Sequence, residues 1–412
     1  MVSFESSHHS VFSKLVMSEE IREVLEMDSN WDSVTKLAGE LMACQSVSPA
    51  DDGAQSILAE RLERAGFKID SLCIDGVHSF LAIYGKKGPL VAFSGHSDVV
   101  PAGDPAAWSS PPFEPEVREG CLYGRGAIDM KGPLSASVVA AESFASRCSE
   151  KGLPIRVGFL VAGDEEVMSN HGTKDLLALL AERGDRVEHC IVTESTSHSV
   201  LGDMVKVGRR GSLVGQLTIR GVQGHSAYPH LASNPISKAL LPLRQLDEKV
   251  WGRGYEGFPP TSFQITNIQA GTGAANVIPG DLQVMFNFRF SPEYTSEVLQ
   301  DEVEKILKEF NLDFDIVWSC DARPFLTQKG VLSEIVSESI QSILGLDTEF
   351  STTGGTSDAR FIAPTGAEVI EFGTLSKMCH QVDEHVAVSD LNQLSKIYED
   401  VLDRFVTHYQ GG

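Results

Sequence analysis

Three consecutive carboxylates, Asp164, Glu165 and Glu166, directly follow the apolar run IRVGFLVAG. This run is short, rich in aliphatic residues and closed by glycine, which is typical of a buried strand that turns out of a sheet. Neighbouring carboxylates at the end of a buried strand repel one another and resist the loss of water. Bound divalent cations would offset both costs, and one carboxylate could stay unligated and transfer a proton.

A histidine and an aspartate end another predicted strand, in the sequence PLVAFSGHSDVV. Alternation along a strand places His96 and Asp98 on the same face. His96 could then offer one ring nitrogen to a metal, while Asp98 orients the imidazole or the neighbouring base. Such a pair on its own is more often an ordinary hydrogen bond, so this interpretation depends on further ligands nearby.

Three more candidate ligands lie at strand ends or in loops. Asp129 lies in YGRGAIDMKG, where a helix N-cap is the simpler interpretation, Glu194 ends HCIVTES, and His380 lies in SKMCHQVDEH. In open α/β sheets the carboxyl ends of the strands border the binding crevice. Together with His96 and the acid pair 165–166, these residues would form a nitrogen and oxygen donor set suited to two zinc ions.

The surrounding pattern predicts the elements that must hold these residues. Helical periodicity at 31–41, 54–65 and 130–148 alternates with the strand candidates SFLAIYG, PLVAFSGH, IRVGFLVAG and HCIVTES. Strands that alternate with helices predict an α/β layer with a mostly parallel sheet.

The pattern changes near Gly211. The runs SLVGQLTIRG, TSFQITNIQAG and DLQVMFNFRF alternate apolar and polar residues, which is typical of an antiparallel sheet, and helices are predicted at 235–250 and 294–310. The α/β pattern returns at about Asp321 and ends in a helix at 389–408.

We therefore expect two domains and an extension. An α/β catalytic domain with a mostly parallel sheet comprises residues 31–210 and 321–412. It is interrupted at 211–320 by a smaller α+β domain made of an antiparallel sheet and two helices. Residues 1–30 show no sustained pattern and are expected to form an N-terminal extension.

Charge and composition exclude several classes of function. The 412-residue chain carries a formal net charge of -23, which argues against binding to nucleic acid or to anionic membranes. No apolar stretch approaches the length of a membrane span, and the N-terminus lacks the basic start of a signal peptide. Seven cysteines without a CxxC pair favour reduced thiols in a cytosol over a disulfide framework.

The stretch Gly95–Gly132 resembles the di-zinc amidohydrolases of the aminoacylase/carboxypeptidase family. The segments GVQGHSAYPHLASNPI, ANVIPG and TGGTSDARF are similar to the same family, and the similarity runs roughly from Trp31 to the C-terminus. The resemblance implies two Zn²⁺ per subunit, with Co²⁺ as a candidate substitute. It assigns the metal ligands as a set: His96 and Glu194 on one ion, Glu166 and His380 on the other, and Asp129 between them.

The resemblance also implies how the reaction is catalysed. Glu165 would be the general base and Asp98 its supporting carboxylate, and the peptide bond between Asp129 and Met130 would be cis. The inserted domain would serve for dimerisation and as a lid. His225 would act in trans from the partner subunit of a homodimer, accompanied by Tyr228 and Asn276, although a loop histidine is more often a surface residue.

The motifs are most similar to family members that hydrolyse N-succinyl-LL-2,6-diaminopimelate in the bacterial cytoplasm, as part of lysine and diaminopimelate biosynthesis. This small substrate is anionic, so a chain of such negative charge must concentrate cationic side chains at its binding site. The candidate substrate-binding residues are Arg209, Arg210, Arg289, Gly355, Thr356 and Arg360. Alternation in DLQVMFNFRF places Arg289 on the polar face. An arginine considered alone is more often a solvated surface residue, but its planar fork suits a terminal carboxylate.

Two segments depart from the family pattern. FGTLSKMCH differs from the asparagine-containing loop before the second histidine ligand, and TEST replaces GEPT at Glu194. Both segments bear on recognition of the acyl group. The alternatives are therefore hydrolysis of another acyl-amino acid, such as N-acetylornithine, hydrolysis of a peptide, or an inactive binding protein of the same fold.

Overall fold

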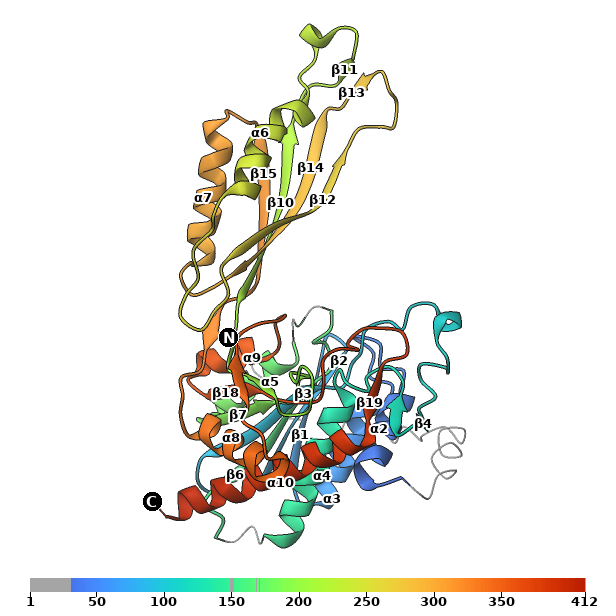
Figure 1. Cartoon of the computed structure of the whole chain (residues 1–412), viewed down its shortest axis with the longest axis vertical. Coiled ribbons are helices and arrows are strands. Elements are labelled where there is room, and N and C mark those ends of the chain that lie inside the picture. Colours follow the sequence, from blue (N-terminus) through green and yellow to red (C-terminus); the bar gives the residue numbers. More distant parts are fainter. Residues whose placement is uncertain (1–30, 149–151, 168, 170, 412) are drawn as a thin grey trace, which may run out of the picture. The chain divides into compact units, whose positions relative to one another are not determined.

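The computed structural model of the chain describes residues 31–148, 152–167, 169 and 171–411. The predicted N-terminal extension, residues 1–30, lies outside the described residues. The chain divides into two compact units (Figure 1). Unit 1 comprises Met1–Val207, Thr327–Phe350 and Ser357–Gly412, and unit 2 comprises Gly208–Leu326 and Ser351–Thr356. In the part of the chain that is described, no helix is long and apolar enough to cross a membrane.

Unit 1 is built on a mixed eight-stranded sheet. In spatial order its strands are β1 (Lys68–Ile74), β2 (Val77–Tyr84), β6 (Arg156–Ala162), β3 (Leu90–His96), β7 (His189–Val192), β18 (Glu368–Glu371), β8 (Met204–Lys206) and β17 (Glu349–Ser351). The central strands β6, β3, β7 and β18 are parallel, whereas β1 and β2 pair antiparallel, β2 pairs antiparallel with β6, and β8 pairs antiparallel with β18. The expected mostly parallel sheet is thus confirmed for its centre, and the outer strands make it mixed.

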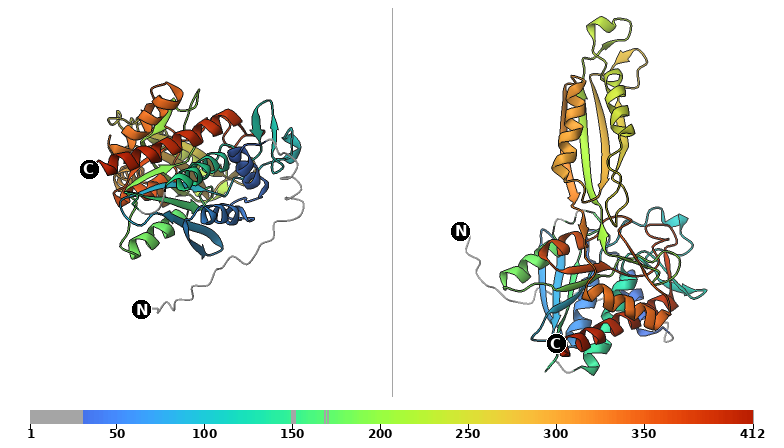
Figure 2. Two further views of the ribbon diagram at one scale, coloured as in Figure 1. Left: turned by 90° about the horizontal axis from the view of Figure 1, so that it is seen from below. Right: turned by 60° about the vertical axis from the view of Figure 1, so that its left-hand side comes forward.

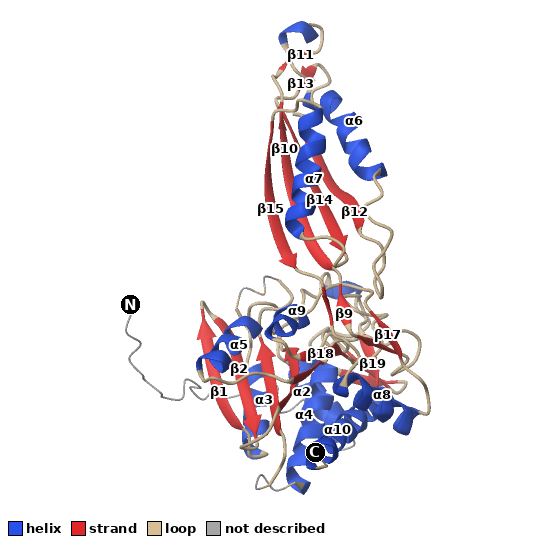
Figure 3. Cartoon of the chain, turned by 90° about the vertical axis from the view of Figure 1, so that its left-hand side faces the viewer, coloured by secondary structure: helices blue, strands red, loops and turns tan. Residues whose placement is uncertain are grey.

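Helices cover both faces of this sheet. The helices of unit 1 are α2 (Ser33–Ala43), α3 (Ala54–Arg64), α4 (Lys131–Arg147), α5 (Thr173–Glu182), α8 (Val331–Leu344), α9 (Ala359–Ile362) and α10 (Val388–Gln410), with short 3-10 turns at Pro105–Ala107 and Ala363–Thr365. α4 and α10 lie side by side and pack with α2, α3 and α8, whereas α5 and α9 pack together beside β2, β6 and β18 (Figures 2 and 3). Because both faces are covered, every residue of β3 is buried.

Aromatic side chains fill the core between the sheet and the long helices. Phe93 on β3 packs against Phe159 on β6 with ring centroids 5.5 Å apart, and against Tyr398 on α10 at 5.1 Å. All three rings are fully buried. Each buried ring of this size stabilises the fold by about 1.5–3 kcal/mol relative to an exposed one. A separate three-stranded sheet, β19 (His385–Ala387), β5 (Cys121–Tyr123) and β4 (Glu116–Arg118), completes unit 1.

Unit 2 is built on a four-stranded antiparallel sheet. In spatial order its strands are β12 (Ser262–Ala270), β14 (Asp281–Phe290), β10 (Gly211–Arg220) and β15 (Phe314–Ala322). Burial alternates along β14, because only one face of the sheet is covered. That face packs against α6 (Pro235–Glu248) and α7 (Ser296–Glu309), which lie on the same side of the sheet (Figure 1). The expected antiparallel sheet with two helices is present.

Two short strand pairs and one 3-10 turn complete unit 2, and one of the two strand pairs lies outside the predicted range 211–320. The strand pairs are β11 (Gly224–His225) with β13 (Val277–Ile278) and β9 (Gly208–Arg209) with β16 (Phe325–Leu326), and the turn is Pro229–Leu231. Pairing of β9 with β16 brings both connecting segments into this unit. Residues 351–356 join it as well, because Thr353 O accepts a hydrogen bond from Arg209 Nη1 at 2.8 Å.

Candidate metal centre and active site

Three candidate segments leave the main sheet at the carboxyl ends of adjacent strands. His96 is the last residue of β3, the acid pair 165–166 follows β6, and Glu194 follows β7. These three strands are adjacent and parallel (Figure 1), so their carboxyl ends lie together. The sheet therefore explains why residues far apart in the sequence meet in unit 1.

A first group of donor atoms forms around His96. Its Nε2 lies 3.3 Å from Asp129 Oδ1 and 3.6 Å from Glu194 Oε1, and the three residues form a group that could hold a metal ion. The imidazole is 2% exposed, and Nε2 has no hydrogen-bond partner of normal geometry among the described residues. Nδ1 lies 2.9 Å from the backbone oxygen of Asp98. A proton on Nδ1 satisfies that carbonyl and leaves the Nε2 lone pair directed at the carboxylates, as in a metal-binding histidine.

A second group forms around His380, and it shares Asp129 with the first. His380 Nε2 lies 3.1 Å from Asp129 Oδ2 and 3.2 Å from Glu166 Oε2. The two oxygens of Asp129 thus face two different histidines. Carboxylate and imidazole are ordinary zinc ligands, and a carboxylate between two histidine sites suits a pair of ions.

The pKa shifts of the residues in both groups indicate that their carboxylates need positive charge nearby. Burial and the charge of Asp129 raise the pKa of Glu194 to about 7. The hydrogen bond to Asp129 raises the pKa of His380 to about 12. Burial alone would raise the pKa of Asp129, but its hydrogen bond with His380 and the positive charge of the nearby His96 lower it far below its ordinary range. The carboxylates of both groups therefore need nearby positive charge, which divalent cations bound at these positions would supply.

Asp98 positions the acid pair through the backbone. It is fully buried, and its carboxylate accepts hydrogen bonds from the backbone N–H of Glu165 at 3.3 Å and of Glu166 at 3.1 Å. It also lies 3.6 Å from His96 Nδ1. Burial raises the pKa of Glu165 well above its ordinary value; the positive charge of His96 opposes this shift, and neighbouring carboxylates add to it. A carboxyl group in such surroundings is suited to accept a proton.

A buried ion pair that no sequence pattern indicated holds the segment that leads to Asp129. Glu384 Oε1 accepts hydrogen bonds from the backbone N–H of Ile128 at 2.9 Å and of Asp129 at 3.2 Å. Its other oxygen accepts a hydrogen bond from Arg125 Nη1 at 2.6 Å, and Arg125 Nη2 reaches the backbone oxygen of His380 at 3.5 Å. The pair thereby connects the loops of two ligands. The expected cis peptide between Asp129 and Met130 is confirmed.

Two further buried carboxylates lie in the same part of unit 1. Asp358 accepts a hydrogen bond from Thr173 Oγ1 at 2.6 Å, and Glu371 accepts one from Ser357 Oγ at 2.6 Å. The charge of Asp358 contributes to the raised pKa of Glu165. Asp358 lies within the motif TGGTSDARF, but the sequence alone indicated no role for Asp358 or Glu371, since buried acids are recognised only once their partners are known.

In unit 2, strands β11 and β13 bring together the three residues expected to act across subunits. Ser226 N donates to the backbone oxygen of Asn276 at 2.9 Å, and the rings of His225 and Tyr228 lie 5.6 Å apart. Nδ1 of His225 accepts a hydrogen bond from Ala227 N at 3.0 Å. The neutral imidazole therefore carries its proton on Nε2, where it is available as a donor.

The candidate substrate-binding arginines belong to both units. Arg209, Arg210 and Arg289 lie in unit 2 with Gly355 and Thr356, whereas Arg360 lies in unit 1. Arg210 Nε, Thr356 Oγ1 and Arg360 Nε are buried and have no hydrogen-bond partner among the described residues. Burial, together with the positive charge of Arg289, lowers the pKa of Arg210. An anionic group bound near Arg210 would accept a hydrogen bond from its buried Nε and would weaken the repulsion between Arg210 and Arg289.

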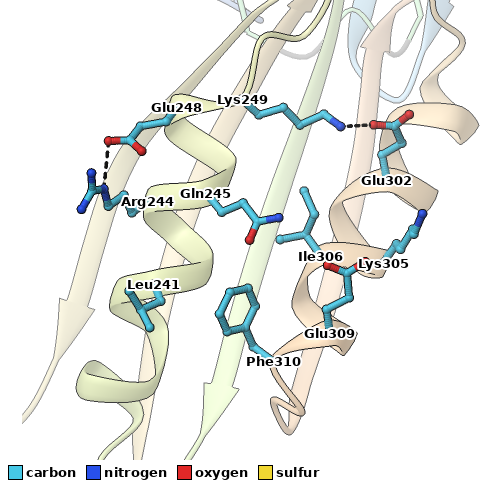
Figure 4. A pocket seen from close by; sticks show the side chains of 10 residues that line it. All are labelled: Leu241, Arg244, Gln245, Glu248, Lys249, Glu302, Lys305, Ile306, Glu309 and Phe310. Carbon is cyan, nitrogen blue, oxygen red and sulfur yellow. Dashed lines mark hydrogen bonds and ion pairs between the residues drawn. The ribbon is translucent and has the colours of Figure 1, made fainter.

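A groove of about 800 Å³ lies between α6 and α7 of unit 2. Figure 4 shows that several of its charged side chains pair with one another, Arg244 with Glu248 and Lys249 with Glu302. Among the described residues, both groups of potential metal ligands lie in unit 1 and neither lies in this groove. The groove is therefore not the candidate catalytic centre.

Comparisons with known proteins identify a family and close relatives of this chain. The sequence model of peptidase family M20/M25/M40 matches residues 92–404. A succinyl-diaminopimelate desuccinylase of Nitrosococcus oceani is 48% identical over 372 residues, which cover 90% of this chain and 98% of that protein. A protein of the same name from Acinetobacter baylyi is 48% identical over 378 residues, which cover 92% of this chain and 100% of that protein.

Solved structures share the fold at low sequence identity. The M20 family metallo-carboxypeptidase Sso-CP2 from Sulfolobus solfataricus superposes with a TM-score of 0.77 at 16% identity, covering 92% of this chain and 100% of that one. The YXEP protein of Bacillus subtilis, described as a dinuclear metal-binding peptidase of the M20 family, has a TM-score of 0.67 at 16% identity, covering 95% and 99% of the two chains.

Proposed function

The chain belongs to peptidase family M20/M25/M40, and we propose that it hydrolyses N-succinyl-LL-2,6-diaminopimelate to succinate and LL-2,6-diaminopimelate. The observation that carries the proposal is the pair of ligand groups joined by Asp129, in a chain 48% identical to desuccinylases over most of its length. The family is one of metal-dependent hydrolases, and the donor set of this chain fits that chemistry. All seven cysteines are free, which agrees with the bacterial cytoplasm as the place of the reaction.

Two zinc ions fit the donor atoms of unit 1. His96 and Glu194 would hold one ion, Glu166 and His380 would hold the other, and Asp129 would contact both. When bound, such ions lower the pKa of a water molecule and polarise the amide carbonyl. The unpartnered Nε2 of the buried His96 supports this assignment, because a buried nitrogen without a partner is costly unless it binds a ligand.

The residues of the chain then move the proton. Glu165 accepts a proton from the attacking water and passes it to the departing amine of diaminopimelate. Asp98 holds the backbone of both glutamates, so that one side chain can bind metal while its neighbour faces the water. The amide bond breaks as the amine receives this proton, and succinate leaves as the carboxylate.

Metal removal tests the proposal. Protein stripped with a chelator is expected to lose hydrolysis of N-succinyl-LL-2,6-diaminopimelate, and two equivalents of Zn²⁺ per chain should restore it. The measurement is amine release against metal content, with Co²⁺ as a second reconstituting ion. Full turnover by protein that contains no metal would overturn the two-zinc assignment.

We further propose that the protein is a homodimer in which His225 acts on the partner subunit's substrate. Its Nε2 proton is available to stabilise the developing oxyanion, with Tyr228 and Asn276 beside it. His225→Ala is expected to bind two metals and to lose about 10²-fold in kcat, which is what removal of one oxyanion donor costs. The measurements are steady-state kinetics and metal content.

Mixing two inactive variants tests whether His225 acts in trans. In a mixed dimer of His225→Ala with Glu165→Gln, one crevice has an intact Glu165 and an intact His225 from the other chain, and the second crevice lacks both. Random exchange makes about half of the dimers mixed, so about a quarter of the wild-type activity should return. No recovery despite demonstrated subunit exchange would show that His225 acts within its own chain or not at all.

A further inference from the structure

Cys379 lies beside two of the assigned metal ligands, although neither the sequence pattern nor the family comparison gives it a role. Its Sγ lies 2.7 Å from Asp129 Oδ2, and it directly precedes His380. Sγ, a carboxylate oxygen of Asp129 and a ring nitrogen of His380 all lie within 4.8 Å of one another. With metal–sulfur distances of about 2.3 Å and metal–oxygen or metal–nitrogen distances of about 2.0–2.2 Å, two ligands of one tetrahedral ion lie about 3.5 Å apart, so a small outward movement of Sγ from Oδ2 would let these atoms contact a single ion.

A second observation points to a bound ligand at the other oxygen of Asp129. The buried Nε2 of His96 points at Asp129 Oδ1 and has no hydrogen-bond partner of normal geometry among the described residues. Asp129 is thus flanked on one side by a nitrogen that lacks a hydrogen bond and on the other by the sulfur. Among the groups of potential metal ligands in the described part of the chain, Cys379 is the only cysteine.

We infer that Cys379 Sγ is a ligand of the divalent ion held by Asp129, Glu166 and His380. As sulfur binds the ion, the S–H bond breaks and its proton passes to solvent, so that the bound form is a thiolate. The two sites then differ in chemistry: the ion at His96 has only nitrogen and oxygen ligands, whereas the ion at His380 also has a soft sulfur ligand. Such a site favours zinc over manganese or magnesium. This inference rests on the proposed two-metal function.

X-ray absorption at the zinc edge tests the inference directly. The wild-type protein, loaded with two equivalents of Zn²⁺ in a sulfur-free reductant, is expected to show a sulfur neighbour at about 2.3 Å from zinc. Because the cysteine binds only one of the two zinc ions, the average is about half a sulfur neighbour per zinc. Cys379→Ser should lose this signal. Cys320→Ser is the matched control, because Cys320 is an exposed cysteine on β15 of unit 2, and it should keep the signal.

Metal affinity provides a second readout. In a titration against a competing chelator, Cys379→Ser is expected to lower the zinc affinity of one of the two sites by at least about tenfold. Loss of a residue that only supports a ligand already lowers metal affinity by about this factor, and loss of a direct ligand should cost at least as much. Two bound zinc ions without a sulfur neighbour in the wild type would overturn the inference and leave the proposed function intact. A sulfur signal that persists in Cys379→Ser would also overturn it. Failure of the wild type to bind zinc would overturn the inference and the proposed function together.

Discussion

Glu165→Gln is expected to lower kcat by about 10²–10⁴-fold, the contribution of a positioned general base, while both metals stay bound. Glutamine keeps the shape of the side chain and removes its ability to accept the proton. The backbone N–H of residue 165 still donates to Asp98, so the fold around the site is retained. The measurements are kcat on the succinyl substrate and zinc content per chain.

Glu166→Gln is the matched control, because it makes the same chemical change one residue away. Its carboxylate lies 3.2 Å from His380 Nε2, so we expect loss of metal from one site and partial recovery of activity in excess zinc. Glu165→Gln should not recover in excess zinc. Equal metal loss in the two variants would contradict the division of roles between the two glutamates.

The proximity of three candidate ligand segments could be predicted from sequence, because His96, the acid pair 165–166 and Glu194 each end or follow a strand of the parallel part of the sheet. A strand that is apolar over most of its length is buried on both faces and belongs to the centre of a parallel sheet, and β3, β6 and β7 fit this description. The ends of such strands meet at one edge. His96 and Glu194 were therefore expected to lie together although almost one hundred residues separate them.

The partners of these ligands could not be predicted in the same way. Glu384 and Arg125 are charged residues in loops, where the usual expectation is exposure to water, and 259 residues separate them. Only the folded chain shows that both are buried and paired. Cys379 was likewise one of seven cysteines without a spacing motif, and its relevance depends on its distance from Asp129.

The limits of unit 2 were predicted less well than its centre. The long strands β10, β12 and β14 show clear alternation, whereas β9 and β16 contain two residues each and have no period to detect. Their pairing assigns Arg209 to unit 2. Strand β1 has largely exposed or half-exposed residues, so no hydrophobic pattern marked it.

The second large effect concerns the acyl group. We expect kcat/KM for N-succinyl-LL-2,6-diaminopimelate to exceed that for N-acetyl-LL-2,6-diaminopimelate by at least about 10³-fold, since a site built to bind a polar group strongly rejects the analogue that lacks it. The two substrates share the same amine half and differ only in the terminal carboxylate of the acyl chain. Comparable kcat/KM values would overturn the succinyl assignment and leave a di-metal hydrolase of other acyl-amino acids or peptides.

Arg210 is the residue from which we expect this selectivity to arise. Its Nε is buried without a partner among the described residues, and the positive charge of Arg289 adds to the cost of burial that lowers its pKa. A succinyl carboxylate would supply the missing acceptor and separate the two positive charges, whereas an acetyl group would do neither. Arg210→Lys should therefore lower kcat/KM for the succinyl substrate and leave the acetyl substrate nearly unchanged. Arg220→Lys is the control, because Arg220 is exposed and pairs with Asp315. If Arg210→Lys reduced turnover of both substrates equally, Arg210 would not recognise the acyl carboxylate.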